Sequence, residues 1–278
     1  MKKKWISILL TLSMALGLTA CGGGNAVCKV TVEGKEYDLS ADFQDVVGEM
    51  VKNDIMVINM VTRAGYDEDG KFVRIDITDR GDIWCYAQER PTNARINENP
   101  IIFAQYEMGL GDIEFKTAQG IDDSSDAGDV KKLEGYVPQM GLYNKGDETY
   151  AAMYIDGKVV DLEQYEDIFD EWVEEVEESG FMEAKEKYLE NVFYYPASSR
   201  ILNNGMDIER IGDWLDDERY YAKEEMLIAF AAQEAGELLE AGKIDSYDII
   251  FYEEMDGEMI VNYYHYYYDD NWDQNKFR

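Results

Sequence analysis

The stretch SYDIIFYEEMDGEMIVNYYHYYY, residues 246–268, carries the most specific structural signal in the chain. Two runs rich in β-branched and aromatic residues flank Asp256-Gly257, and an Asp-Gly pair in this position is typical of a two-residue hairpin turn. Such a turn fixes the register of the two strands, so that Asp248 lies opposite His265. We therefore predict a C-terminal antiparallel hairpin in which these two residues form a structural pair and not a catalytic one.

Tyrosine is concentrated in the second strand of this hairpin, and a tryptophan follows it closely. Tyrosine rings can stack on sugars and present a hydroxyl group, which makes this strand a candidate binding surface. The alternative is cross-strand aromatic packing in the core, which we expect for at least one row because the tyrosines lie on both faces. The candidate binding residues are Tyr263, Tyr264, Tyr266, Tyr268 and Trp272.

Two further glycine turns, Glu33-Gly34 and Asp156-Gly157, predict hairpins that are each followed by an amphipathic helix. The apolar stripes of the two helices are Phe43, Val46, Val47, Met50 and Val51 in the first, and Tyr165, Ile168, Phe169, Trp172 and Val173 in the second. The two hairpin-helix units also share a lysine after the glycine and an Asp-Leu pair before the helix. We infer an internal duplication. Independent origin is the alternative, because glycine turns and amphipathic helices are common.

The remaining segments predict a mixture of strands and helices. Apolar patterns indicate strands over 72–78, 83–87 and 101–106, and helices over 163–178, 181–193, 207–215 and 217–241. A loop or boundary is expected over 119–132, where neither pattern continues. We predict an α+β fold of antiparallel β-hairpins packed on amphipathic helices. Its units, 28–145 and 146–278, are two domains, or one domain if their hairpins share a sheet.

The chain is strongly acidic, with 59 Asp and Glu residues against 26 Lys and Arg and a formal net charge of −33. Such a charge opposes binding to nucleic acid, whose partners present basic patches, and to anionic membrane surfaces. It suits neutral or cationic partners, and it also keeps a protein soluble. The hydrophobic fraction of 46% is high enough for a folded core.

The N-terminus has the organisation of a secretory signal, and residues 1–20 are predicted to be removed. Three lysines precede an apolar run over 5–18, and the run ends in Leu18-Thr19-Ala20-Cys21. These four residues resemble the lipobox of bacterial membrane lipoproteins. The resemblance implies that Cys21 is joined to a diacylglycerol and becomes the new N-terminus, at the start of a glycine-rich tether over 21–27. An ordinary cleaved signal or a single N-terminal membrane helix is the alternative.

Few residues are available for metal or nucleophile chemistry. Once Cys21 is lipidated, Cys28 and Cys85 remain, and they form either one disulfide or two separate core thiols. His265 is the single histidine of the sequence, so sites built from several histidines and cysteines lack their parts. The acidic loop at 120–129 does not follow the ligand order of an EF-hand. We therefore expect no catalytic residue, no metal site and no cofactor.

Together these features favour a lipid-anchored protein on the extracytoplasmic face of the cell membrane. We predict a non-catalytic module that binds a ligand or a neutral or cationic envelope partner, and not nucleic acid. A carboxylate-only envelope enzyme such as a glycosidase is one alternative, because two carboxylates suffice for that reaction. The solute-binding component of an importer is another, although that class usually alternates strands and helices in parallel sheets.

Overall fold

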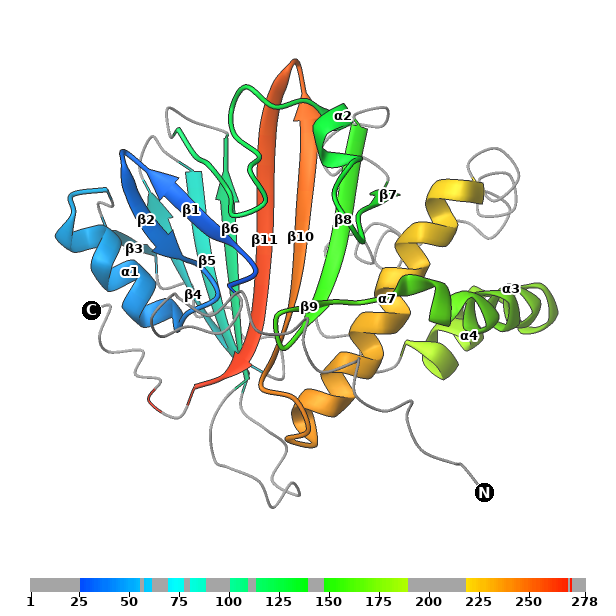
Figure 1. Cartoon of the computed structure of the whole chain (residues 1–278). Helices are drawn as coiled ribbons and strands as arrows, with labels where there is room; N and C mark the ends of the chain where they lie inside the picture. The colour runs from blue at the N-terminus through cyan, green and yellow to red at the C-terminus, as the bar shows by residue number, and fades with distance from the viewer. Residues whose placement is uncertain are drawn as a thin grey trace, which may run out of the picture.

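A computed structural model describes residues 26–55, 58–61, 70–77, 81–88, 101–109, 114–139, 148–189, 219–269 and 271. Its centre is a nine-stranded antiparallel sheet, and other elements pack on both faces of that sheet (Figure 1). Strands and helices thus form three layers, and the predicted α+β class with antiparallel hairpins is confirmed.

The strands of the large sheet are, in spatial order, β3 (Ile58–Val61), β4 (Gly70–Ile77), β5 (Gly81–Gln88), β6 (Ile101–Met108), β11 (Glu258–Tyr268), β10 (Ser246–Met255), β8 (Glu148–Ile155) and β7 (Val137–Gln139), and β9 (Lys158–Val159) also pairs with β8. One face, the hairpin side, is covered by β1 (Lys29–Val32), β2 (Lys35–Asp38) and α1 (Phe43–Lys52). The other face, the helix side, is covered by η1 (Leu162–Tyr165), α3 (Glu166–Ser179), α4 (Phe181–Tyr188) and α7 (Arg219–Glu240).

The C-terminal hairpin forms as predicted and lies in the middle of the large sheet. Asp256 and Gly257 have φ angles of 56° and 85°, the positive values that a two-residue type I′ turn requires. Asp248 pairs with His265 across the two strands. β11 also pairs with β6, and β10 with β8, so strands from both predicted units form one sheet. The predicted unit boundary at 145 lies outside the described residues.

The two predicted hairpin-helix units share their local geometry. The φ angles are 49° and 74° in Glu33-Gly34, and 47° and 72° in Asp156-Gly157. Each following helix buries residues of its predicted stripe: Phe43, Val46, Val47 and Met50 in α1, and Phe169 and Trp172 in α3. The surroundings differ, because β1 and β2 form a sheet of their own whereas β8 and β9 belong to the large one. Internal duplication stays a prediction.

Each side of the large sheet has its own apolar core, in which aromatic rings join the layers. On the hairpin side, the Phe43 ring of α1 lies 5.9 Å from that of Tyr106 on β6. On the helix side, the Trp172 ring of α3 lies 6.4 Å from that of Phe230 on α7. α7 is buried all round over 226–232. Burial of one such side chain contributes about 1.5 to 3 kcal/mol, so these rings hold the layers together.

The segment 119–132, expected to be a loop, contains one helical turn, α2 (Ala127–Val130). Asp126 and Asp129 each accept a hydrogen bond from the other's backbone N–H, which is a capping box. A single turn is too short to show helical periodicity, which explains why the sequence pattern missed it. The predicted helix at 207–215 and the N-terminal segment 1–25 lie outside the described residues. Every helix in the described part of the chain is too short or too polar to cross a bilayer.

Candidate functional site

The tyrosines proposed as a binding surface lie mainly inside the molecule. Tyr263, Tyr264 and Tyr266 are 0%, 2% and 0% exposed. Because β11 is a central strand with both faces covered, their rings pack in the two cores. The prediction that these three residues form an exposed surface is therefore wrong, and cross-strand packing describes them. Tyr268 is half-buried, and Trp272 lies outside the described residues.

Asp248 and His265 form the predicted pair within the core of the hairpin side. His265 Nδ1 lies 2.5 Å from Asp248 Oδ1, and the two residues are 3% and 1% exposed. The Tyr263 hydroxyl donates to the same carboxylate oxygen over 2.5 Å. The His265 ring also stacks on Tyr267, with 4.6 Å between the ring centroids. The pairing is confirmed, and its burial makes it part of the packing between β10 and β11.

A series of hydrogen bonds links this pair to Val27 and Cys28. Tyr263 has one hydroxyl proton, which it donates to Asp248, so its oxygen accepts the hydroxyl of Ser40 over 3.0 Å. Ser40 Oγ in turn accepts the backbone N–H groups of Val27 and Cys28, at 3.0 and 3.3 Å. All the donors point toward Asp248, and hydrogen bonds aligned in this way polarise one another. This series of hydrogen bonds holds Val27 and Cys28 in place just before β1.

Cys28 is a buried free thiol, so the alternative of a disulfide with Cys85 does not apply. Burial raises the pKa of the Cys28 thiol well above its usual range, and the carboxylates of Asp248 and Asp38 add to the rise. A thiol of this kind stays protonated and reacts poorly as a nucleophile. Cys28 is therefore a packing residue of the core.

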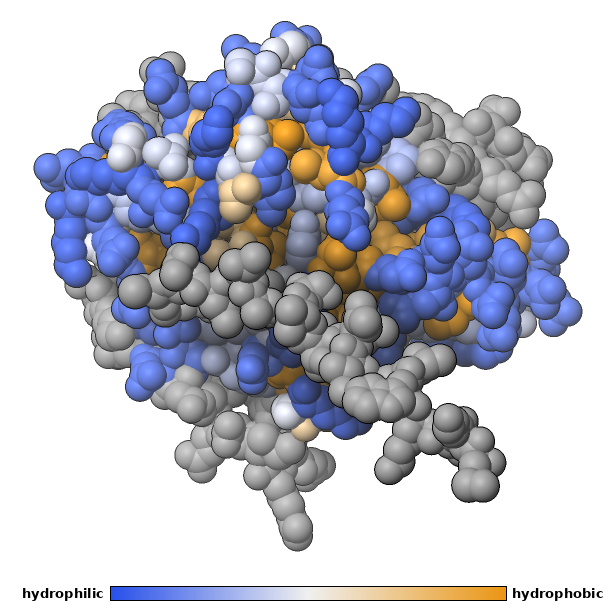
Figure 2. All heavy atoms as spheres, in the orientation of Figure 1, coloured by the Kyte–Doolittle hydropathy of each residue, from blue (hydrophilic) through white to orange (hydrophobic). Residues whose placement is uncertain are grey.

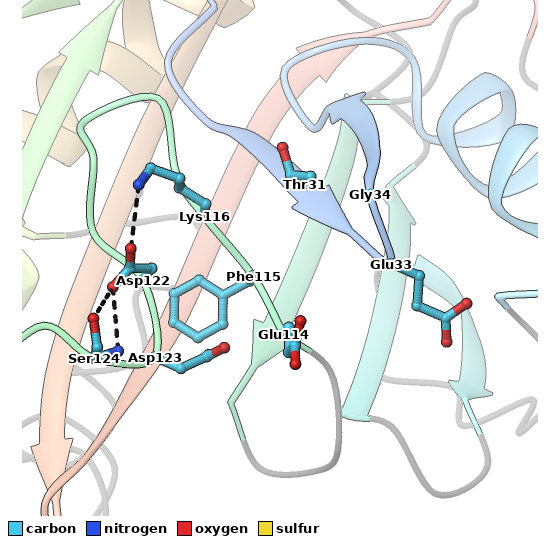
Figure 3. A pocket seen from close by; sticks show the side chains of 9 residues that line it. All are labelled: Thr31, Glu33, Gly34, Glu114, Phe115, Lys116, Asp122, Asp123 and Ser124. Atoms are coloured by element: carbon cyan, nitrogen blue, oxygen red, sulfur yellow. Dashed lines mark hydrogen bonds and ion pairs between the residues drawn. The ribbon is translucent and has the colours of Figure 1, made fainter.

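An open pocket of about 430 Å³ lies between the β1–β2 hairpin and the segment 114–124 (Figure 3). Its lining residues are Thr31, Glu33, Gly34, Glu114, Phe115, Lys116, Asp122, Asp123 and Ser124. Four of these side chains are carboxylates and one is a lysine, so the walls carry a net negative charge. We call this the acidic pocket.

Backbone pairing holds the two walls of the acidic pocket together. The Thr31 N–H donates to the Lys116 carbonyl over 3.1 Å, which attaches the segment 114–124 to the outer edge of β1. The segment then turns back on itself, because the Thr117 N–H donates to the Ile121 carbonyl over 2.8 Å. Phe115 is buried in the hairpin-side core. The carboxylates of the pocket therefore project from a well-anchored backbone.

The two aspartates of the acidic pocket have different electrostatic surroundings. The Ser124 hydroxyl, 2.7 Å from Asp122, lowers the pKa of that carboxyl, and Lys116, at 3.2 Å, lowers it further. Desolvation by the pocket walls raises the pKa of Asp123; the Phe115 backbone N–H opposes this rise, and the neighbouring carboxylates add to it. Lys116 thus forms an ion pair with Asp122. Because the other carboxylates of the pocket outnumber this lysine, the pocket can accept an additional positive charge.

The acidic pocket has no clear signature in the sequence. One wall comes from the turn after β1, and the other from a segment about 80 residues later that showed no periodic pattern. The number of acidic residues in 120–129 was the only signal, and it was tested only against the order of calcium ligands. Among the described residues, no three His, Cys, Asp or Glu side chains form a group that could hold a metal ion.

Comparisons of the chain with protein-family models, with curated proteins and with solved structures returned no match. The lipoprotein prediction therefore depends on residues 1–21, which lie outside the described residues. The chemistry of the acidic pocket is the basis for inferring the class of ligand.

Asp123→Asn is expected to remove a pH-dependent loss of stability. The folded-state pKa of Asp123 is raised, so the folded protein holds this proton more tightly than the unfolded chain does. The wild type therefore loses stability as the pH rises from the unfolded value of about 3.9 through the folded one. The loss is below about 1 kcal/mol because the side chain is exposed. Urea unfolding at a series of pH values measures it.

The control for this measurement is Asp170→Asn, on the exposed surface of α3. It should keep the pH dependence of the wild type. Identical pH profiles for the wild type and Asp123→Asn would contradict the assignment.

Proposed function

We propose that this chain is a lipid-anchored binding protein on the extracytoplasmic face of a bacterial cell membrane, and that its acidic pocket takes a cationic group of a ligand or envelope partner. The charge of the pocket carries the proposal, because four carboxylates and one lysine line it, and that lysine is already paired with Asp122. A positive group entering the pocket gains Coulomb energy from these carboxylates. The lipobox at Cys21 supports the location.

The path from the anchor to the pocket fits this arrangement. Val27 follows Cys21 by six positions, a length of chain that reaches at most about 20 Å. Val27 is held by Ser40 and by Gln119, whose side-chain amide donates to the Val27 carbonyl over 2.5 Å. β1 then leads away from this point, at about 3.3 Å per residue, to the turn that forms one wall of the pocket (Figure 1). The domain would stay near the membrane, with its pocket at the far end of β1.

The surface away from the pocket also suits a cationic partner. Hydrophilic residues cover the outer sides of α1 and α3 in the view of Figure 2. The exposed carboxylates of α3 are Glu166, Asp167, Asp170, Glu171, Glu174, Glu177 and Glu178. Lys223 pairs with Glu166, and Lys187 with Glu175, so only part of this charge is compensated by neighbours. Such a field raises the rate at which cationic partners arrive, and it also keeps the domain soluble.

The two alternative functions gain no specific support. An importer component is expected to have parallel sheets, whereas every strand pair of the described sheets is antiparallel. The described residues provide no observation that favours carboxylate-only catalysis in the acidic pocket over binding there.

Mass spectrometry of the native protein tests the anchor. The full chain is expressed in a bacterium that processes lipoproteins, as wild type and as Cys21→Ser. The wild type is expected to begin at Cys21, to carry a diacylglycerol and to partition into the detergent phase. The variant should lack the lipid. A wild-type protein that begins at Met1, or that carries an unmodified sulfur, would overturn the anchor.

Charge reversal tests the acidic pocket separately. Glu114→Lys with Asp123→Lys changes the pocket, and Glu171→Lys with Glu174→Lys makes the same charge change on the exposed face of α3. Calorimetry with spermine as the cationic probe should show affinity reduced about tenfold or more by the first pair and only slightly by the second. Equal reductions would mean that long-range attraction alone binds the probe, and would overturn the pocket assignment.

A further inference from the structure

The helix side of the large sheet contains a polar group where apolar packing is expected. Ile249, Phe251 and Glu253 alternate onto this side of β10, and the first two belong to its apolar core. Glu253, the next in the series, is 0% exposed. The strand register places Thr149 of β8 directly opposite Glu253, and Asn262 of β11 diagonally beside it. These three side chains, which we call the polar cluster, lie on one face of three adjacent strands.

Two atoms of the polar cluster, Thr149 Oγ1 and Asn262 Nδ2, have no hydrogen-bond partner in the part of the chain that the structure describes. The two residues are 2% and 3% exposed, so bulk solvent does not compensate for the missing bonds. A buried polar group without a partner destabilises the folded protein, and native proteins rarely retain one without a reason. Two such groups on either side of a buried carboxylate indicate a place for a polar ligand.

The polar cluster lies at the margin of the core. Glu148, at the start of β8, is exposed, and Glu254 on β10 is half-buried. Polar residues extend the cluster along the sheet, because Gln139 of β7 and Glu107 of β6 pair with its outer members. The cluster is therefore closer to solvent than the apolar core beside it.

The donors and acceptors of the polar cluster select the ligand. A carboxylate only accepts hydrogen bonds, Asn262 Nδ2 only donates, and the Thr149 hydroxyl does both. An ammonium group can donate to Glu253 but cannot accept from Asn262. A hydroxyl group donates to the carboxylate and accepts from the amide. Thr149 and Asn262 lie two strand spacings apart across the sheet and two residues apart along it, about 12 Å in all, which matches a molecule that carries several hydroxyl groups.

We propose that the helix side of the large sheet holds an internal binding site for a hydroxyl-rich ligand, a sugar or polyol, formed by Glu253, Thr149 and Asn262. Glu253 accepts from the ligand hydroxyl groups, while Asn262 and Thr149 donate to them. The Phe251 ring, buried on the same face, supplies an apolar wall of the kind that packs against sugar rings. The acidic pocket lies on the opposite side of the sheet, so each proposal stands without the other.

Saturation-transfer NMR on the full chain tests this site, with glucose, N-acetylglucosamine and glycerol as probes. Thr149→Val and Asn262→Leu replace the polar groups by apolar groups with the same branching, and Glu258→Gln, exposed on β11, is the control. At least one probe should give a transfer signal in the wild type and in the control. Each of the two cluster variants should reduce its affinity by about tenfold or more.

Unfolding experiments distinguish lost binding from lost folding. Because each cluster variant removes a buried polar group that lacks a partner, both should be at least as stable as the wild type without a probe. The proposal is overturned if none of the three probes binds the wild type. It is also overturned if both variants bind as well as the wild type, since the cluster would then hold an ordered water only.

Discussion

Replacing Asp248 with alanine is expected to lower the free energy of unfolding by about 3 to 5 kcal/mol. Asp248 Oδ1 accepts hydrogen bonds from His265 and Tyr263, each over 2.5 Å, and all three residues are buried. Alanine leaves both donors without an acceptor in the core, and each unsatisfied buried group costs about 1 to 3 kcal/mol. Urea unfolding of the two proteins at the same pH measures the difference.

Two variants serve as controls for this substitution. Asp248→Asn keeps an acceptor oxygen in place, so it should lose less stability than Asp248→Ala. Asp245→Ala removes an exposed carboxyl just before β10 and should change stability by no more than about 0.5 kcal/mol. A loss below about 1 kcal/mol in Asp248→Ala would contradict the structural role of the pair.

Trp172→Ala should lower the free energy of unfolding by a similar amount, about 3 to 5 kcal/mol. Trp172 is fully buried on α3, and its ring lies 6.0 Å from Phe169 and 6.4 Å from Phe230 of α7. Removing the indole leaves a cavity between α3 and α7. The rigid sheet behind the two helices limits how far this cavity can collapse. Thermal or urea unfolding gives the magnitude.

The neighbouring Glu171 provides the matched control, because it lies on the exposed face of the same helix. Glu171→Ala removes one charge from an acidic surface and introduces the best helix former, so its effect should be close to zero or slightly stabilising. If Trp172→Ala and Glu171→Ala had similar effects, α3 would not be held by packing on α7.

The features that sequence analysis predicted correctly depend on residues close together in the chain. Asp256-Gly257 adopts two positive φ angles, and this turn alone sets Asp248 opposite His265. The spacing of apolar residues likewise identified α1, α3, α4 and α7 and most of the residues that α1 and α3 bury.

The exposed tyrosine surface was predicted wrongly for a tertiary reason. Alternation along β11 shows that its side chains point to two faces, but it contains no information about what covers either face. In the structure, β1, β2 and α1 cover one face and the helices cover the other, so Tyr263 and Tyr264 are both buried. The acidic pocket was missed because it requires the pairing of Thr31 with Lys116, far along the chain.

By itself, the sequence determined the hairpin turns, the amphipathic helices and the register of the last two strands. Each of these depends on backbone conformation and hydrophobic spacing within a few residues. Only the tertiary structure decided which faces of the sheet are covered, where the acidic pocket opens and which polar atoms of the core lack partners. These properties arise from contacts between segments that are far apart in the sequence. Such contacts produce no pattern among neighbouring residues.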